Sequence, residues 1–281
     1  MKLVTWNTQW CCGVDGVVSP ARIAEAARAL ADFDVLCLQE IAVNYPGLRG
    51  NSDQDQVASL AALLPGFQLF FGAAVDEFDA SGGRHRFGNL VATRLPVAQV
   101  QHHPLPWPAD AGVRSMPRMC TIVTVLDAQL GPVRIMTTHL EYYSKPQRMA
   151  QARALRELHL EYVARALARP EQSNDGSPFQ SKVHTANAIV CGDFNLQPHE
   201  PEYAELTRQD PAGRLWDSWR LQRGEAPHQP TFLVHERSHG PDPIACDFVF
   251  VSDGLKDRVR RMEVDGATQA SDHQPVLLEL G

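Results

Sequence analysis

The sequence has no apolar run that approaches the length of a membrane span, and it has no low-complexity tract. A membrane helix needs about 20 consecutive apolar residues. Disordered chains are poor in apolar residues, whereas 44% of this chain is hydrophobic and 21% is charged. The amino terminus enters a strand-like pattern directly, without the apolar segment and small-residue cleavage site of a signal peptide. We therefore expect a folded cytoplasmic protein, unless a leader has been removed.

Several common enzyme motifs are also missing. The sequence contains no C-x-x-C pair, and the motifs GxSxG and GxxxxGK[ST] do not occur. These absences disfavour a zinc site, a serine hydrolase and a P-loop nucleotide hydrolase.

The six cysteines do not suggest a disulfide framework. Cys11 and Cys12 are adjacent and cannot easily bridge each other. The other four lie in apolar, strand-like runs: Cys37, Cys120, Cys191 and Cys246. We expect these four to be buried, reduced thiols that pack as small hydrophobic side chains.

Positive charge is in the minority. The chain has 26 Lys and Arg against 33 Asp and Glu, which gives a net charge of −7. A field of this sign repels polyanions and disfavours non-specific binding to a nucleic acid duplex, although a local basic patch would still allow nucleic acid as a partner. The basic residues near the expected loops are few and scattered: Arg49, Arg84, Arg86, Arg114, Arg118 and Lys145.

The apolar patterns predict alternating strands and helices. A strand at residues 3–10 precedes a helix that begins at Ser19-Pro20 and ends near Asp32, and a buried strand follows and ends at Gln39-Glu40. The two strands are parallel if they share a sheet. Further strands are expected at 68–72, 88–94, 120–126, 133–140, 189–190, 247–251 and 276–280, with helices at 57–64, from 144 onward and near 200–208.

The segments between these elements are expected to be loops that overhang the strand ends. They are Tyr45–Gln54, Ala80–Phe87, His102–Arg118, Pro170–Thr185 and His228–Pro243. The arginines of the longest helix stand opposite its apolar stripe, so we expect them to be solvated.

Polar residues that can carry chemistry stand where apolar runs begin or end. They are Asn7, Glu40, His139, Asp193, Asn195, Asp247, Asp272 and His273. Each one alone is explained by an ordinary strand end or turn. Together they supply hard oxygen ligands and two imidazoles, a set that suits Mg²⁺ or Mn²⁺ and the cleavage of a phosphate ester.

The order of the short motifs WNTQW, LQE, GNLVATRLP, THLE, GDFN, DFVFVS and SDHQPV resembles that of the endonuclease/exonuclease/phosphatase superfamily, the deoxyribonuclease-I-like fold. The resemblance covers essentially the whole chain. It implies a single domain over residues 1–281 and an α/β fold, a four-layer sandwich in which two mixed sheets pack face to face with helices outside.

The resemblance also implies roles for the polar residues. Asn7, Glu40 and Asp272 match the ligands of the catalytic Mg²⁺ (or Mn²⁺). Asp193 and Asn195 match the pair that orients or activates the attacking water. His139 matches a phosphate contact. Either Asp193 or a second residue, His273, could take the proton of the water, and the sequence leaves this open.

Asp247 and His273 match the Asp-His pair of the family. A carboxylate beside an imidazole raises its pKa and fixes its orientation, so that His273 can donate to a phosphoryl oxygen near neutrality. Many members carry an arginine shortly before the acid matched by Asp247, whereas this chain has Ala245 and Cys246 there. A phosphate contact is therefore missing or replaced.

These features predict a monomeric, Mg²⁺-dependent hydrolase that cleaves a small or lipid-like phosphoester or a nucleic acid end through in-line attack by water. A DNA or RNA nuclease is the alternative within the same chemistry. A non-catalytic binding module that keeps the fold is the alternative from another class, disfavoured because the whole metal and water-activating set is present.

Overall fold

The computed structural model describes residues 1–52, 55–168 and 171–281. The expected loops Tyr45–Gln54 and Pro170–Thr185 each lie partly outside these ranges. Within them, no helix combines the length and the apolar character needed to cross a membrane. All six cysteines are free and buried, as expected for Cys37, Cys120, Cys191 and Cys246.

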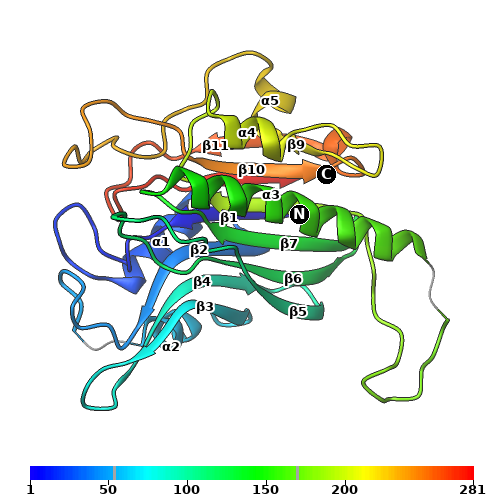
Figure 1. Cartoon of the computed structure of the whole chain (residues 1–281), viewed down its shortest axis with the longest axis horizontal. Coiled ribbons are helices and arrows are strands. Elements are labelled where there is room, and N and C mark those ends of the chain that lie inside the picture. Colours follow the sequence, from blue (N-terminus) through cyan, green and yellow to red (C-terminus); the bar gives the residue numbers. More distant parts are fainter. Residues whose placement is uncertain (53–54, 169–170) are drawn as a thin grey trace.

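Two six-stranded sheets form the centre of the molecule (Figure 1). The strands are β1 Lys2–Asn7, β2 Val35–Val43, β3 Gln68–Phe78, β4 Arg84–Thr93, β5 Val97–Pro104, β6 Met119–Asp127, β7 Gly131–His139, β8 Ala188–Asp193, β9 Leu215–Asp217, β10 Asp247–Ser252, β11 Val259–Val264 and β12 Val276–Leu280. The first sheet has the order β11-β12-β1-β2-β4-β3, and the second has the order β5-β6-β7-β8-β10-β9. Both are mixed, because β1 and β2 pair in parallel, as do β7 and β8, while their other neighbours are antiparallel.

Helices cover the outer faces of both sheets. They are α1 Pro20–Leu30 and α2 Gln56–Leu63 on the first sheet, and α3 Lys145–Ala168 and α4 Pro201–Leu206 on the second. The short helix α5 Ser218–Arg223 instead contacts β11 of the first sheet and β9 and β10 of the second, and a 3₁₀ turn lies at Lys256–Arg258. Ser19 caps α1 through its side chain, and Pro20 occupies the first turn, as the sequence predicts. The long helix α3 crosses the second sheet (Figure 1).

Three apolar layers hold these elements together. The central layer joins the sheets, and it packs residues such as Leu3 and Val35 of the first with Ile135 and Ile189 of the second. One outer layer packs α1 and α2 against the first sheet, and the other packs α3 and α4 against the second. The architecture is therefore the four-layer α/β sandwich with two mixed sheets that the sequence predicts.

Two strand ends differ from the prediction. β1 ends at Asn7 rather than at Trp10, because Gln9, Trp10 and Cys11 adopt left-handed backbone angles, with φ of 48°, 45° and 60°. β2 does not end at Glu40 but continues to Val43. Its register with β4 shifts between Leu38 and Ile41, and Glu40 has a φ of 61°, which marks a β-bulge.

Three further predictions, two about loops and one about the surface of α3, were wrong. His102–Pro104 belongs to β5, an edge strand where proline is tolerated, and only the segment after it is a loop. Arg84 and its neighbours extend β4 instead of forming a loop tip. On α3, Arg148 and Arg156 are buried, not solvated, because acids from the following segment pair with them: Glu200, Glu202 and Asp210.

Candidate active site

The eight polar residues named from the sequence come together at one end of the two sheets. Asn7 ends β1, His139 ends β7 and Asp193 ends β8, while Asp247 begins the antiparallel strand β10. Six of the eight line a cavity of about 600 Å³: Glu40, His139, Asp193, Asn195, Asp272 and His273. The other two, Asn7 and Asp247, lie directly behind this wall and contact its members.

Gly192 sets the position of Asp193. Its φ is 137°, and a Cβ at this residue would lie 1.9 Å from the carbonyl oxygen of Thr138 on β7. Only glycine lets the two parallel strands approach this closely. The approach pairs Asp193 with His139 in register, and Asp247 pairs with Asp193 from the other side.

Asn7 links the two sheets within the site. Its Nδ2 donates to Oε1 of Glu40 at 3.2 Å and to Oδ2 of Asp193 at 2.9 Å. Its Oδ1 accepts from the backbone N–H of Gln9, whose side chain in turn donates to Oδ2 of Asp272 at 2.9 Å. One amide therefore fixes carboxylates that come from both sheets.

The carboxylates of Glu40 and Asp272 form an electronegative corner of the cavity. Burial, followed by the charge of Asp272, raises the pKa of Glu40 to about 7. Burial also raises the pKa of Asp272. Such shifts mean that the buried, ionised forms need more positive charge nearby than His273 provides. Hard oxygen donors of this kind fit a divalent cation such as Mg²⁺, which would supply that charge.

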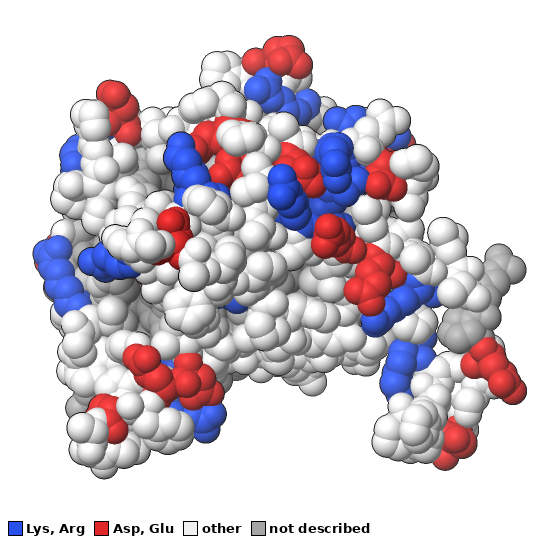
Figure 2. Space-filling model, in the orientation of Figure 1, with Lys and Arg blue, Asp and Glu red and all other residues white. Residues whose placement is uncertain are grey.

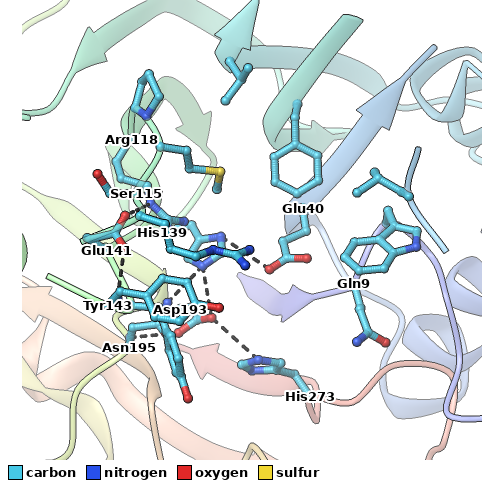
Figure 3. A pocket seen from close by; sticks show the side chains of 18 of the residues that line it. Gln9, Glu40, Ser115, Arg118, His139, Glu141, Tyr143, Asp193, Asn195 and His273 are labelled. Carbon is cyan, nitrogen blue, oxygen red and sulfur yellow. Dashed lines mark hydrogen bonds and ion pairs between the residues drawn. The ribbon is translucent and has the colours of Figure 1, made fainter. Parts of the chain in front are cut away.

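His139 is neutral. Burial, and then the charge of Arg118, lower its pKa to about 3. Its Nε2 lies 3.0 Å from Nδ2 of Asn195, whose amide also donates to the carbonyl of Leu140 at 3.0 Å. Because Asn195 donates to Nε2, the proton of the imidazole is assigned to Nδ1. His139 can therefore offer one N–H on its Nδ1 side, which faces Glu40 at 3.9 Å (Figure 3).

His273 has the opposite electrostatic environment. Its Nδ1 lies 2.9 Å from Oδ2 of Asp247, and its Nε2 faces Oδ2 of Asp193 at 3.7 Å. Burial by itself lowers the pKa of His273, but the charges of Asp247 and Asp193 outweigh it and raise the pKa well above its usual value. The ring is stacked on Phe232, with centroids 4.4 Å apart. His273 is thus held as an oriented cation.

Arg118 is a site residue that was expected from the sequence only as one of several scattered basic residues. It is buried, its Nε donates to Oε2 of Glu141 at 3.1 Å, and its Nη1 has no hydrogen-bond partner. It lines the cavity near His139 and Glu40 (Figure 3). Only its place after a proline-rich loop was visible in the sequence, because its ion pair with Glu141 is a contact between two strand ends.

The rest of the cavity is largely aromatic. Its walls include Trp10, Tyr45, Phe87, Trp107, Tyr142, Tyr143 and Phe232. The guanidinium of Arg114 lies over the ring of Tyr143, 5.0 Å from its centroid. These residues come from six separate segments. Three of the expected loops therefore overhang this end of the sheets: Tyr45–Gln54, His102–Arg118 and His228–Pro243.

The sequence and the fold are both similar to those of known proteins. The model of the Endonuclease/Exonuclease/phosphatase family matches residues 4–273. No curated protein matches the chain. Among solved structures, an endonuclease/exonuclease/phosphatase from Beutenbergia cavernae is 26% identical with a TM-score of 0.65, and the match covers 100% of this chain and 72% of that one.

Two further structures share the fold at lower identity. A mannosyl-6-phosphatase from Bacteroides thetaiotaomicron is 19% identical, with a TM-score of 0.67 and coverage of 100% of this chain and 99% of that one. Truncated TDP2 from Caenorhabditis elegans is 18% identical, with a TM-score of 0.63 and coverage of 100% and 97%. The chain therefore belongs to the Endonuclease/Exonuclease/phosphatase family, an enzyme family whose members hydrolyse phosphate esters.

Proposed function

We propose that this single-domain protein is a Mg²⁺- or Mn²⁺-dependent hydrolase of a compact phosphate ester that carries an aromatic or apolar group. The observation that carries the proposal is the wall of the 600 Å³ cavity. There, the carboxylates of Glu40 and Asp272 stand beside Asp193 and the His273–Asp247 pair. Asn7, Glu40 and Asp272 would hold the ion. When bound, it supplies positive charge that stabilises the phosphoryl oxygens during cleavage.

The other polar side chains of the site have separate roles in the proposed reaction. Asn195 and Asp193 orient the attacking water, and Asp193 accepts its proton. We assign this step to Asp193 because the raised pKa of His273 keeps that ring protonated near neutrality. His273 then donates a hydrogen bond from Nε2 to a phosphoryl oxygen, while Asp247 holds its Nδ1–H. His139 offers its Nδ1–H to the phosphate from the opposite side.

The choice of a compact substrate rests on volume and charge. A cavity of about 600 Å³ is within the range of sites that enclose a whole small molecule. A duplex nuclease needs a continuous basic surface along several phosphates. Here Arg84 pairs with Asp76 and Lys145 with Glu200. On the face seen in Figure 2, basic and acidic groups are interspersed.

The substrate class can be tested in one Mg²⁺ buffer at physiological salt. We expect hydrolysis of bis-p-nitrophenyl phosphate and of small aryl or alkyl phosphoesters, with weak or no nicking of plasmid DNA. Rates are compared on these esters, plasmid, single-stranded oligonucleotides, 5′-tyrosyl oligonucleotides, inositol phosphates and sphingomyelin. Efficient plasmid nicking would favour the nuclease alternative. No hydrolysis of any substrate would favour the binding module.

Arg118 is proposed to contact the phosphate through its unpartnered Nη1, in place of the arginine missing before Asp247. Arg118→Lys keeps the charge beside Glu141 but loses the planar fork, so we expect kcat/KM to fall by about tenfold or more. The matched control is Arg156→Lys, since Arg156 is also buried and paired with an acid, Asp210, at 2.6 Å. Steady-state kinetics that change equally in both variants would refute the contact.

A further inference from the structure

A second cluster of metal-ligating groups lies behind the cavity wall. Among the described residues, Asp193, Cys246 and His273 each place one donor atom so that the three atoms lie within 4.8 Å of one another. All three side chains are more than nine-tenths buried. Cys246 does not line the cavity, but Asp193 and His273 do, so the cluster is reached from the cavity.

The thiol of Cys246 is close to both members of the His-Asp pair. Its Sγ lies 4.0 Å from Nδ1 of His273 and 3.5 Å from Oδ2 of Asp247. The other oxygen of Asp247, Oδ1, is buried and has no hydrogen-bond partner. A buried carboxylate oxygen without a partner is uncommon and costly. Asp247, next to the three-residue cluster, therefore has a carboxylate oxygen whose bonding capacity is unused.

The composition of this cluster differs from that of the Glu40 and Asp272 corner. Magnesium prefers oxygen ligands, whereas a thiolate with an imidazole and a carboxylate suits zinc or cadmium. Zinc bonds of about 2.3 Å to sulfur and about 2.0 Å to nitrogen imply a separation of about 3.6 Å between the two ligand atoms in a tetrahedral site. The Sγ to Nδ1 distance of 4.0 Å is only slightly longer.

We propose that Asp193, Cys246, Asp247 and His273 form a binding site for Zn²⁺ and similar soft divalent cations, and that occupation of this site inhibits the enzyme. On binding, the thiol of Cys246 releases its proton to solvent and Sγ bonds to the ion. His273 also releases its Nδ1 proton to solvent, and Nδ1 bonds to the same ion in place of its hydrogen bond with Asp247. No group is oxidised or reduced.

Inhibition follows because the site shares two residues with the proposed reaction. An ion held by Asp193 and His273 prevents Asp193 from accepting a proton, and it replaces the hydrogen bond through which Asp247 orients His273. This part of the inference rests on the proposed function, whereas binding of the ion does not. Excess Mg²⁺ should not reverse the inhibition, since it does not compete well for a thiolate.

Binding is tested without activity, through the ultraviolet charge-transfer absorption of a cadmium–thiolate bond. We expect one equivalent of Cd²⁺ to produce this band in the unmodified protein, and Cys246→Ala and Cys246→Ser to lose it. Two variants are used in case one of them folds poorly. Cys120→Ala is the matched control, because Cys120 is fully buried in the core and should leave the band unchanged.

Inhibition is tested with Zn²⁺ in saturating Mg²⁺, with each variant normalised to its own zinc-free rate. The half-inhibitory Zn²⁺ concentration should rise by at least about tenfold in Cys246→Ala and stay unchanged in Cys120→Ala. Absence of the cadmium band in the unmodified protein, or its persistence in both Cys246 variants, would overturn the site. A band without any Mg²⁺-supported hydrolysis would instead refute the proposed function and leave the metal site standing.

Discussion

Replacing His273 with alanine should lower kcat by about 10³-fold while the fold is retained, because the oriented cation that stabilises the phosphoryl oxygens is lost. Asp247→Ala should have an effect of similar order, since Asp247 holds Nδ1 of His273 at 2.9 Å and raises its pKa. The double variant should fall no more than about threefold below the slower single variant, because the two residues act as one unit.

A second buried pair supplies the matched control. His228 lies 2.6 Å from Asp217 and is equally shielded from solvent, but neither residue lines the cavity. His228→Ala should lower thermal stability with near-normal kcat. Steady-state kinetics and thermal melts of all four variants distinguish a role of the His273–Asp247 pair in catalysis from a role in stability. Losses that simply multiply in the double variant, or a loss of kcat in His228→Ala, would mean that the His273–Asp247 pair has no special role.

Replacing Glu40 with alanine should raise the Mg²⁺ concentration for half-maximal activity by at least about 100-fold, because the variant lacks a hard ligand at a strand bulge. EDTA should abolish activity in the unmodified protein. Glu77→Ala is the control for charge, since Glu77 lines the same cavity on β3 away from the Glu40 and Asp272 corner. An active enzyme that is insensitive to EDTA would refute the metal assignment.

The raised pKa of Glu40 adds a pH dependence to this prediction. Without a cation, Glu40 binds a proton below about pH 7. The proton competes with Mg²⁺, so the apparent metal affinity should fall as pH decreases through 7. For the metal-free protein the sign is opposite: a carboxyl whose pKa is raised on folding favours the folded state at low pH and loses this contribution as pH rises toward 7. Glu40→Gln should remove both trends, as titration calorimetry and thermal melts at several pH values would reveal.

Most of the features predicted correctly from the sequence depend on residues that are close together in the chain. The N-cap of α1, the antiparallel pair β6 and β7, and the two-residue spacing of Asp193 and Asn195 all depend on neighbours in the chain. The order of the short motifs then allowed both sheets to be predicted together. The polar residues named at the boundaries of apolar runs do lie close together in the structure, although Glu40 stands at a bulge within β2 and not at its end.

What the sequence did not reveal depends on contacts between distant segments. Arg148 and Arg156 looked like a solvated helix face until acids some 50 residues further along proved to pair with them. Arg118 and Cys246 gained their significance only from Glu141 and His273. The bulge at Glu40 was also invisible, since a left-handed glutamate has no composition signal and is held there by the paired strands.

The division of the site between two sheets has a consequence for mutational tolerance. Glu40 and Asp272 are attached to the first sheet, whereas His139, Asp193 and Asp247 are attached to the second, and hydrogen bonds of Asn7 and His273 bridge the two sheets. The separation of the two groups is therefore set by the thickness of the layer that contains Leu3, Val35 and Ile135. Conservative substitutions in that layer alter the reaction geometry while most of the folding free energy is kept, so libraries selected for stability alone will accumulate folded but slow enzymes.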